Sequence, residues 1–436
     1  MIKPRHVLGS VASFLAFMVC LHSAEADKVE ITVGRIYEVD LQSILSELAD
    51  EYAQSSPDVR IVVPERATCE QHIKLKSYLR THQTFPDIVV LSVHEAKLAD
   101  ELPYCVSNDL IAPLDGLIEP SIDKDDFFPS LWNAIEYQDH LWGVPFYAES
   151  FGILYNKRML EDSGIHTVPE TWAHFRDALG KMTRDTDGDG EIDQWGWAVS
   201  DLPELLMYWL TSAMQNGGSL WHENRFDLSQ PEFEEAFERV KVLRKFYNNV
   251  ISDGYELIRP KNPYAAQYVQ SYQLLDWIER ATDWPPQFRC ADERFLVGPC
   301  PQFGPQYKVP MVLSLYFAIR KSSADKEQAC WDFIRWATSA EIQQRYVERY
   351  DFLPLRNSIA SSDMFQTKVL RKPHLGVFTE MLRRSTPVFP YVQGAPLALR
   401  RLFHRFVQAY NKDDPSDHFE SELLYIESLM NEAVAP

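Results

Sequence analysis

The acidic segment Asp185-Thr-Asp-Gly-Asp-Gly-Glu-Ile-Asp193 carries the most specific chemical motif in the chain. Its oxygen-bearing side chains, its central glycine and the backbone carbonyl that follows match a calcium-binding loop, although Gly196 stands where such loops place a bidentate glutamate. Further ligands would have to come from Gln194, water or elsewhere. Clustered carboxylates repel one another without a cation, but Asp and Gly also form ordinary turns. The motif predicts a structural calcium site, with a metal-free turn as the alternative, and its predicted ligands are Asp185, Asp187, Asp189, Glu191 and Asp193.

Glu149 is the second residue whose chemistry stands out, because it interrupts an apolar run from Leu141 to Tyr155. Burying an unpaired carboxylate is costly. The run therefore predicts that Glu149 meets a ligand, with a structural partner such as an arginine as the alternative. We interpret the run as a strand that leaves one lobe, passes through a cleft and enters another. A pairing with Glu38 or Glu95 would imitate the two carboxylates of a glycosidase.

Other enzyme motifs are incomplete. His94-Glu95 begins like a zinc-protease helix but lacks the second histidine. Ser323-Ala-Asp-Lys326 fits the Ser-x-x-Lys pattern, yet it stands at a predicted helix start, where serine usually caps the helix. The sequence contains neither a Gly-x-Ser-x-Gly motif nor a phosphate loop. These observations favour a binding protein over an enzyme, with no catalytic residue and no required cofactor.

The first 26 residues are typical of a cleavable secretory signal peptide. Lys3 and Arg5 precede an apolar stretch, and Ala24-Glu-Ala26 provides small residues for cleavage. Cys20 would suggest a lipid anchor instead, but the bulky Val19 precedes it. The formal net charge of −20 disfavours nucleic acid as a partner, because phosphate binding needs a basic surface. No later apolar run has the length of a membrane helix, so we expect an exported, soluble protein.

Five cysteines follow the predicted cleavage site, so at least one stays unpaired within the chain. Two of them are close in sequence and flanked by proline and glycine, which fits a small bridged loop between Cys290 and Cys300. Buried thiols are the alternative. The spacing contains no Cys-x-x-Cys pair, which argues against structural zinc. The five are Cys69, Cys105, Cys290, Cys300 and Cys330.

Hydrophobic periodicity predicts an α/β protein. Apolar runs at 29–33, 59–63 and 88–91 alternate with helical patterns at 40–52 and 69–81, which indicates parallel strands with crossover helices. Ligands of such sheets bind beyond the carboxyl ends of the strands, so the loops at 34–40 and 92–95 would line the cleft. Further along the chain, the pattern predicts strands at 295–301 and 309–320, and helices at 172–182, 233–246, 326–338, 340–349 and 423–430.

Several motifs together resemble the extracellular solute-binding proteins of the maltose-binding-protein superfamily, which serve ABC importers. Gly143-Val-Pro-Phe146, Gly152-Ile-Leu-Tyr-Asn-Lys157 and Pro169-Glu-Thr-Trp172 match that family's first crossing between lobes. Asn216-Gly-Gly218 resembles a loop at its cleft, and Leu353-Pro354 matches its closing region. The resemblance implies a two-lobe periplasmic-binding-protein fold with three interlobe crossings and a ligand cleft between the lobes. It places 27–147 and 298–352 in the N-terminal lobe, and 148–297 and 353–436 in the C-terminal lobe.

The resemblance also implies a set of ligand-binding residues. Glu149 lies where sugar-binding members place a carboxylate, and aromatic faces suit the CH faces of sugar rings while polar edges take the hydroxyl groups. The segment 264–284 departs from the family pattern around Trp277. The implied ligand residues are Arg35, Tyr37, Glu38, His94, Glu95, Tyr147, Glu149, Tyr208, Trp209, Trp277, Ser314, Tyr316 and Tyr391.

The sequence therefore predicts a periplasmic sugar or oligosaccharide receptor that closes around its ligand by hinge motion and presents it to an ABC permease in the inner membrane. We expect a monomer. A secreted carbohydrate-active enzyme and a receptor that feeds a membrane sensor are the alternatives.

Overall fold

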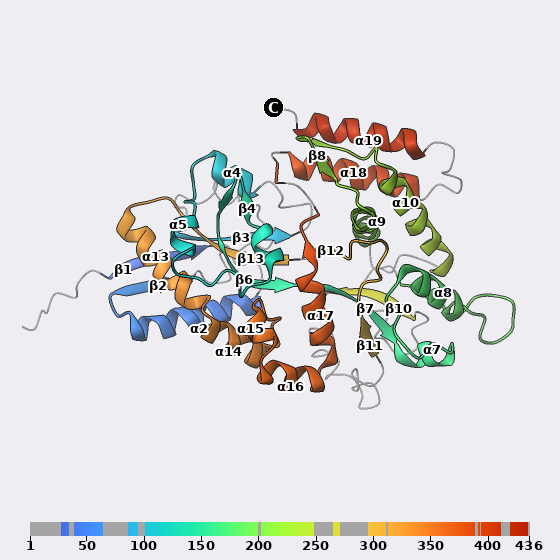
Figure 1. Ribbon diagram of the computed structural model, residues 1–436, viewed down its shortest axis with the longest axis horizontal. Helices are drawn as coiled ribbons and strands as arrows, with labels where there is room; N and C mark the ends of the chain where they lie inside the picture. The colour runs from blue at the N-terminus through green and yellow to red at the C-terminus, as the bar shows by residue number, and fades with distance from the viewer. Residues whose placement is uncertain are drawn as a thin grey trace, which may run out of the picture.

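The computed structural model describes residues 28–34, 39–63, 86–94, 101–198, 202–247, 265–270, 295–310, 313–388, 391–392, 394–410 and 419–434. Two separate sheets organise these residues, each with its own helices, and Figure 1 shows them side by side. The predicted signal peptide and the predicted helix at 69–81 lie outside the described residues. None of the described helices combines the length and the hydropathy needed to cross a bilayer.

The first sheet has the strand order β2-β1-β3-β13-β6. β1 is parallel to β2 and β3, as the alternating sequence pattern predicts, whereas β13 runs antiparallel to both β3 and β6. α13 packs against β1 and β13, and α14 follows it. The strands are β1 (Val29–Gly34), β2 (Val59–Val62), β3 (Ile88–His94), β6 (Val144–Glu149) and β13 (Leu313–Ile319). The helices of this part are α2 (Val39–Ser55), α13 (Ala324–Ala337) and α14 (Ala340–Tyr350).

Asp87 joins three parts of this first sheet. Its carboxylate accepts hydrogen bonds from the backbone N–H and the hydroxyl of Thr32, each at 2.9 Å, and contacts Arg320 at 2.5 Å and Lys326 at 3.1 Å. Burial opposes ionisation, but these donors together lower the pKa of Asp87 below its ordinary value. The start of β3 is thereby attached to β1 and to the end of β13.

Short elements connect β3 to β6. Pro129 opens α6, where the missing N–H of proline costs nothing because the first N–H groups of a helix have no intrahelical partner. The hairpin β4–β5 turns through Gln138 and Asp139, both with positive φ. These elements are α4 (Glu101–Ser107), α5 (Asp115–Ile118), α6 (Pro129–Asn133), β4 (Glu136–Tyr137) and β5 (His140–Leu141).

The second sheet contains β10, β7 and β11, with β7 at its centre and both neighbours antiparallel to it. α17 packs against β7 and β11, and a helical layer of α9, α10, α18 and α19 completes this part of the molecule. The strands are β7 (Phe151–Asn156), β10 (Ala266–Gln270) and β11 (Phe295–Gly298). The helices are α7 (Lys157–Asp162), α8 (Trp172–Met182), α9 (Leu202–Asn216), α10 (Pro231–Val242), η2 (Leu243–Phe246), α15 (Asn357–Ala360), α16 (Asp363–Arg371), α17 (Pro373–Arg383), α18 (Ala395–Tyr410) and α19 (Phe419–Val434).

Two small sheets complete the described strands. The hairpin of β8 (Trp221–His222) and β9 (Arg225–Phe226) lies against α19, where the side chain of Asn431 bonds both the N–H and the carbonyl of Phe226. The pair of β12 (Val309–Pro310) and β14 (Ser385–Thr386) joins the segment before β13 to the segment after α17.

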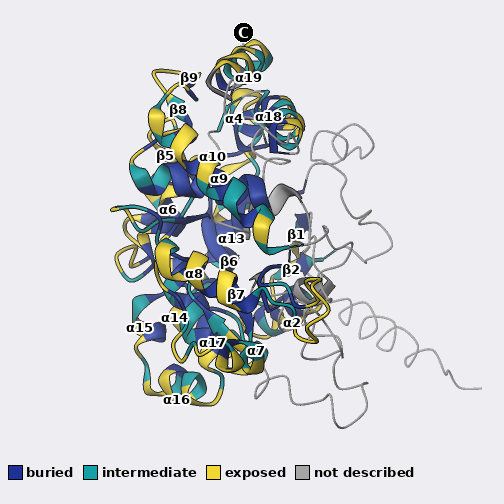
Figure 2. Ribbon diagram, turned by 90° about the vertical axis from the view of Figure 1, so that its right-hand side faces the viewer, coloured by how far each residue is buried: buried dark blue, intermediate teal, exposed yellow. Residues whose placement is uncertain are grey.

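The apolar run around Glu149 is two strands rather than one. β6 ends at Glu149 in the first sheet and β7 begins at Phe151 in the second, so the chain changes sheet at Ser150. Every residue of β6 is buried, and Figure 2 shows exposed residues mainly on the outward sides of the surrounding helices. The predicted strand at 309–320 is also divided, into β12 and β13. The exact lobe boundaries stay a prediction.

The segment after α14 returns across the molecule beside residues 126–128. Phe128 donates its backbone N–H to the carbonyl of Leu355 at 2.9 Å. The guanidinium of Arg356 lies 3.8 Å from the ring centroid of Phe127 and contacts the carboxylate of Asp126 at 3.3 Å. A cation over an aromatic face is attractive, most of all when water is excluded. The segment that follows α14 is therefore fixed to residues 126–128.

Cys105, Cys300 and Cys330 are buried. Burial raises the pKa of the Cys330 thiol to about 12, which keeps it protonated at neutral pH. Cys69 and Cys290 lie outside the described residues, so the predicted Cys290–Cys300 loop stays a prediction.

Candidate functional site

Glu149 lies at the edge where strands of the first sheet end. Leu313 pairs with His94 of β3 on one side and with Glu149 of β6 on the other. β3 and β6 are both antiparallel to β13 and therefore parallel to each other, so their carboxyl ends meet at the same edge of the sheet. Ligands of open α/β sheets bind beyond such ends. Two of the predicted ligand residues thus share one row of the sheet.

The side chain of Glu149 has a hydroxyl partner two residues earlier on the same strand. Tyr147 donates its phenolic O–H to Oε1 of Glu149 at 2.8 Å, and only 3% of Glu149 and 7% of Tyr147 is exposed. The ring of Tyr147 meets Phe352 edge to face, with 4.9 Å between the centroids. A buried carboxylate needs hydrogen-bond donors, and Tyr147 supplies one of them to Glu149.

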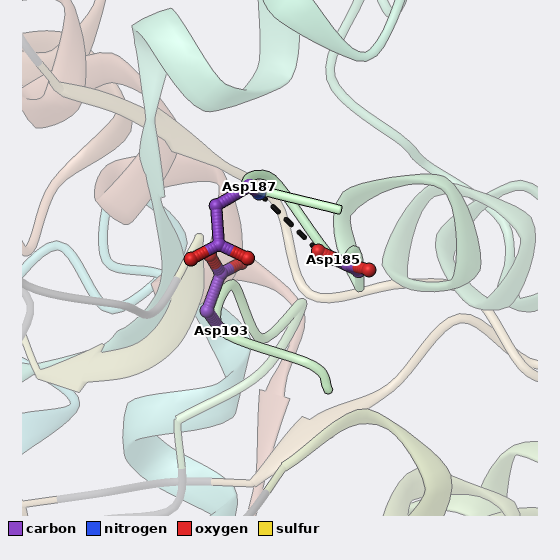
Figure 3. Close-up of side chains that lie close together, drawn as sticks. All are labelled: Asp185, Asp187 and Asp193. Carbon is purple, nitrogen blue, oxygen red and sulfur yellow. Dashed lines mark hydrogen bonds between the residues drawn. The ribbon is translucent and has the colours of Figure 1, made fainter. Parts of the chain in front are cut away.

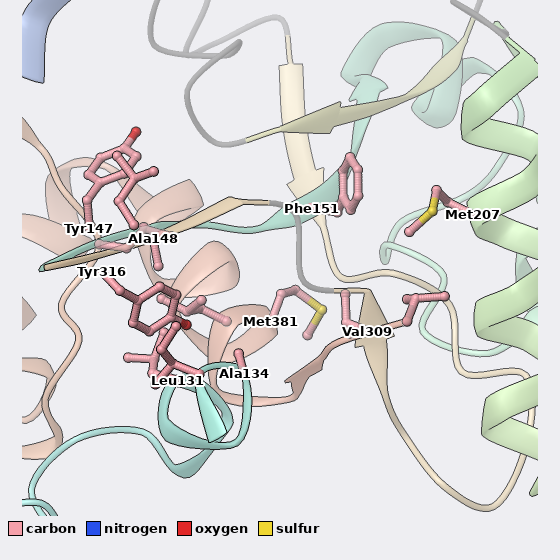
Figure 4. Close-up of a cluster of buried hydrophobic side chains, with 14 of the residues drawn as sticks. Leu131, Ala134, Tyr147, Ala148, Phe151, Met207, Val309, Tyr316 and Met381 are labelled. Atoms are coloured by element: carbon pink, nitrogen blue, oxygen red, sulfur yellow. The ribbon is translucent and has the colours of Figure 1, made fainter. Parts of the chain in front are cut away.

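Ser314 and Tyr316 lie on the other side of the sheet from Tyr147. Tyr147 pairs with Leu315 across the strands, and side chains alternate along β13. Figure 4 accordingly shows Tyr147 on one side of β6 and Tyr316 on the other, where Tyr316 lies among residues of α6 and α17. Burial raises the pKa of Tyr316 above its ordinary value, against a smaller opposite influence of Ser314. The structure does not bring Ser314 and Tyr316 together with Glu149.

Tyr391 is tied to the first lobe by its hydroxyl, which donates to the backbone carbonyl of Ala134, and its ring meets Tyr137 with 6.3 Å between centroids. Burial, and to a smaller extent the nearby Tyr316, raises the pKa of Tyr391 well above its ordinary value. Tyr391 therefore belongs with Tyr316 on the side of the sheet away from Tyr147.

Tyr208 and Trp209 are core residues of the helical layer, which corrects their assignment to the ligand set. Trp209 is fully buried, stacks on Phe406 with 5.3 Å between centroids and donates its indole N–H to the carbonyl of Phe233 at 2.6 Å. Tyr208 is 1% exposed, and its ring is enclosed by Trp197 and Phe303. Residues of α10 and α18 thus cover Trp209, whereas Tyr208 faces Trp197 and Phe303.

The remaining predicted ligand residues fall outside the described residues, or their side chains do. Arg35, Tyr37, Glu38, Glu95 and Trp277 lie outside the described residues. For His94, the structure describes the backbone within β3 but not the side chain.

Three of the five predicted calcium ligands come together. Ligand oxygens of Asp185, Asp187 and Asp193 lie within 4.8 Å of one another, as Figure 3 shows, while Asp189 and Glu191 are not part of this group. The carboxylate of Asp185 accepts backbone N–H groups from Gly190 at 2.8 Å and Gly188 at 2.6 Å, and these bonds lower its pKa. The loop thus has both the acidic cluster of a cation site and the internal hydrogen bonds of a stable turn.

Gln194 is not oriented as a calcium ligand, which corrects one of the suggested sources for the missing oxygen. Its side-chain amide donates to the carbonyl of Met182 at 2.7 Å, and its backbone forms a bridge with Arg184 that closes the base of the loop. This side chain is buried beneath the loop rather than turned into it.

Phe352 was not among the predicted ligand residues, yet its ring contacts Tyr147 of the candidate site. The pair Leu353-Pro354 indicated a crossing at this point, but nothing in the sequence showed that the preceding aromatic ring would reach Tyr147. The signal would have been the cluster of aromatic residues before the crossing, Tyr346, Tyr350 and Phe352, which contact one another in the structure.

Two lobes, each with its own sheet, and a buried carboxylate where the chain passes from one sheet to the other define a protein of the periplasmic-binding-protein class. A solved structure of the sugar-binding protein MalE from Xanthomonas citri aligns with a TM-score of 0.74 at 18% identity, covering 93% of this chain and 97% of that one. The predicted two-lobe fold is therefore confirmed.

The chain belongs to the bacterial extracellular solute-binding protein family, whose model matches residues 37–344. Among characterised relatives, the maltotriose-binding protein of Pyrococcus abyssi is 22% identical over 77% of this chain and 68% of its own length. The mannitol-binding protein of Pseudomonas aeruginosa is 23% identical over 88% of this chain and 85% of its own length.

Proposed function

We propose that this protein captures a sugar, sugar alcohol or oligosaccharide outside the cytoplasmic membrane and delivers it to an ABC permease. The observation that carries the proposal is the buried carboxylate of Glu149 at the end of β6, where the chain leaves the first sheet. A carboxylate accepts hydrogen bonds from neighbouring ligand hydroxyls, and such charge-assisted bonds are strong. The ligands in the names of the two relatives, maltotriose and mannitol, are both rich in hydroxyl groups, which supports this ligand class.

The ligand would be captured when the two lobes close around it by a hinge motion. The chain changes sheet at Ser150 and between β11 and β13, where Leu313 at the start of β13 pairs with Glu149. The proposed third passage begins near Phe352, whose ring contacts Tyr147. Rotation about a few such residues closes two rigid lobes around a ligand. The proposed role is recognition without turnover, by a monomer that the predicted signal peptide directs to the periplasm.

A thermal-unfolding screen tests the ligand class. A ligand that binds only the native state raises the melting temperature. We expect at least one member of a panel of maltose, maltotriose, mannitol, related polyols and glycerophosphodiesters to raise it at millimolar concentration. A melting temperature that no sugar or polyol changes would contradict the proposal, and a response to glycerophosphodiesters alone would replace the proposed ligand class with that one.

We further propose that the loop 185–193 holds a structural calcium ion, with Asp185, Asp187 and Asp193 as its carboxylate ligands. Hard oxygen ligands in a glycine-containing loop suit calcium. The proposed role is structural, because the cation would hold together a loop whose base the Arg184–Gln194 bridge closes.

A further inference from the structure

Tyr147 connects the proposed ligand carboxylate to the third interlobe passage. Its hydroxyl donates to Glu149 at 2.8 Å, and its ring lies edge to face against Phe352 at 4.9 Å. We propose that Tyr147 is a positioning residue, which sets the orientation of Glu149 for ligand hydroxyls through its own hydroxyl group and does not act by touching the ligand. This inference rests on the proposed carbohydrate-binding function.

The ring of Tyr147 has little freedom to turn. β6 is buried along its whole length, and Phe352 is itself packed against Tyr350 at 5.9 Å and Tyr346 at 6.2 Å between centroids. These two contacts are tilted, whereas the contact of Phe352 with Tyr147 is edge to face, and such aromatic contacts add to the burial of the rings. The direction of the Tyr147 hydroxyl is thus set by aromatic residues that belong to the end of α14 and the passage after it.

That aromatic group is in turn fixed to the outside of the first lobe. The Tyr350 hydroxyl donates to Glu47 of α2 at 2.9 Å, and Arg349 contacts the same carboxylate oxygen at 3.0 Å. Contacts therefore continue from Glu149 through Tyr147 and the aromatic group to α2. The position of the Tyr147 hydroxyl depends on the first lobe and on the third passage at once.

A held carboxylate binds more tightly than a mobile one. Fixing a glutamate side chain on binding costs rotamer entropy, and a carboxylate that is already held in its binding orientation avoids that cost. When Glu149 is ionised, the O–H bond from Tyr147 is charge-assisted, which makes it stronger than a bond between neutral groups. Removing it should weaken ligand binding about tenfold, which corresponds to about 1.4 kcal/mol.

The test compares Tyr147→Phe with the wild-type protein in titrations with maltotriose and, separately, with mannitol. Phenylalanine keeps the ring against Phe352 and removes only the hydroxyl. The matched control is Tyr155→Phe, because Tyr155 is a fully buried tyrosine on the adjoining strand β7 whose hydroxyl makes no hydrogen bond within the described part of the chain. We expect the dissociation constant to rise about tenfold for Tyr147→Phe and to stay unchanged for the control, with both variants folded by circular dichroism.

A second pair of variants separates positioning from direct contact. In a Glu149→Gln background, the charge that makes the Tyr147 bond strong is gone, so the further loss caused by Tyr147→Phe should shrink to about threefold or less. An equal loss in both backgrounds would mean that Tyr147 touches the ligand or acts structurally, and would overturn the inference. So would unchanged affinity in Tyr147→Phe. Wild-type protein that binds no sugar or polyol at all would instead contradict the proposed function, and the inference with it.

Discussion

His94 and Glu149 occupy one row of the first sheet, each paired with Leu313 from an opposite side. The row lies where β3 and β6 end and where the chain leaves for the second sheet at Ser150. Residues from three strands that are far apart in sequence thus converge at one edge. We predict that ligand binds at this edge.

Replacing Glu149 with glutamine tests that edge. The amide keeps the size of the side chain but loses the charge that strengthens bonds from ligand hydroxyls, so affinity should fall by at least tenfold. Isothermal titration calorimetry with the carbohydrate identified by the screen measures the change. Glu136→Gln, an exposed glutamate on β4, is the matched control and should bind like wild type. Equal affinities of Glu149→Gln and the control would remove Glu149 from the site.

Trp209 should contribute to the stability of the protein and not to its affinity for ligand. Trp209→Phe removes the hydrogen bond to Phe233 and leaves a cavity beside Phe406, so we expect the free energy of unfolding to fall by about 2 kcal/mol. The half-buried Trp221 of β8 offers a control, since Trp221→Phe should lower the melting temperature much less. A normal melting temperature combined with lost sugar binding in Trp209→Phe would restore this residue to the ligand set.

Asp351 should make the free energy of unfolding depend on pH in the acid range. It ends α14 with a left-handed backbone and contacts Lys368 at 2.6 Å and Lys372. Burial alone would raise its pKa, but the two lysines outweigh burial, so the pKa is lowered in the folded protein. A carboxyl group with a lowered folded pKa stabilises the protein above its unfolded pKa, and that stabilisation is lost as the pH falls through the folded value.

The variant Asp351→Asn checks this dependence, because asparagine also tolerates the left-handed conformation. We expect it to lower stability by about 1–2 kcal/mol at neutral pH. The difference from wild type should disappear as the pH falls below the ordinary aspartate value of 3.8. Melting temperatures recorded from neutral to acid pH measure it, and a difference that does not change with pH would contradict the ion-pair account.

Calcium should raise the melting temperature of the wild-type protein, and a chelator should lower it. A cation bound only to the folded loop stabilises the native state by mass action. Asp187→Ala should remove the response to both, because Asp187 belongs to the cluster of three carboxylates. Asp177→Ala, an exposed aspartate on α8, should keep it. If the wild-type protein does not respond to calcium or chelator, the loop is a metal-free turn held by the hydrogen bonds of Asp185.

The first sheet was largely predictable because its pattern is local. The runs at 29–33, 59–63 and 88–91 became β1, β2 and β3, and the helix predicted at 40–52 became α2. Glu149 could be identified because a carboxylate inside an apolar run is physically costly wherever the run is buried. A crossing was predicted within this run, but its division into two strands at Ser150 was not, since β6 and β7 differ in their partners and not in their composition.

Side-chain roles that depend on which surfaces meet could not be predicted. Trp209 appeared suited to a sugar ring, but α9 is covered by α10 and α18, and only the packing of those helices reveals it. Tyr147 and Tyr316 both appeared in the predicted ligand set. Tyr147 pairs with Leu315, so the alternation of side chains along β13 places Tyr316 on the opposite side of the sheet. The contact between Tyr147 and Phe352 joins residues that are distant in sequence and carries no local signal.

The most direct test of the proposed function is a calorimetric titration of the wild-type protein with the carbohydrate that raises its melting temperature. The sugar is then recovered from the calorimeter and analysed by chromatography. We predict saturable binding with one ligand per chain and a chemically unchanged sugar. Absence of binding heat for every sugar and polyol, or recovery of a cleaved sugar, would contradict the proposal that this protein is a carbohydrate receptor.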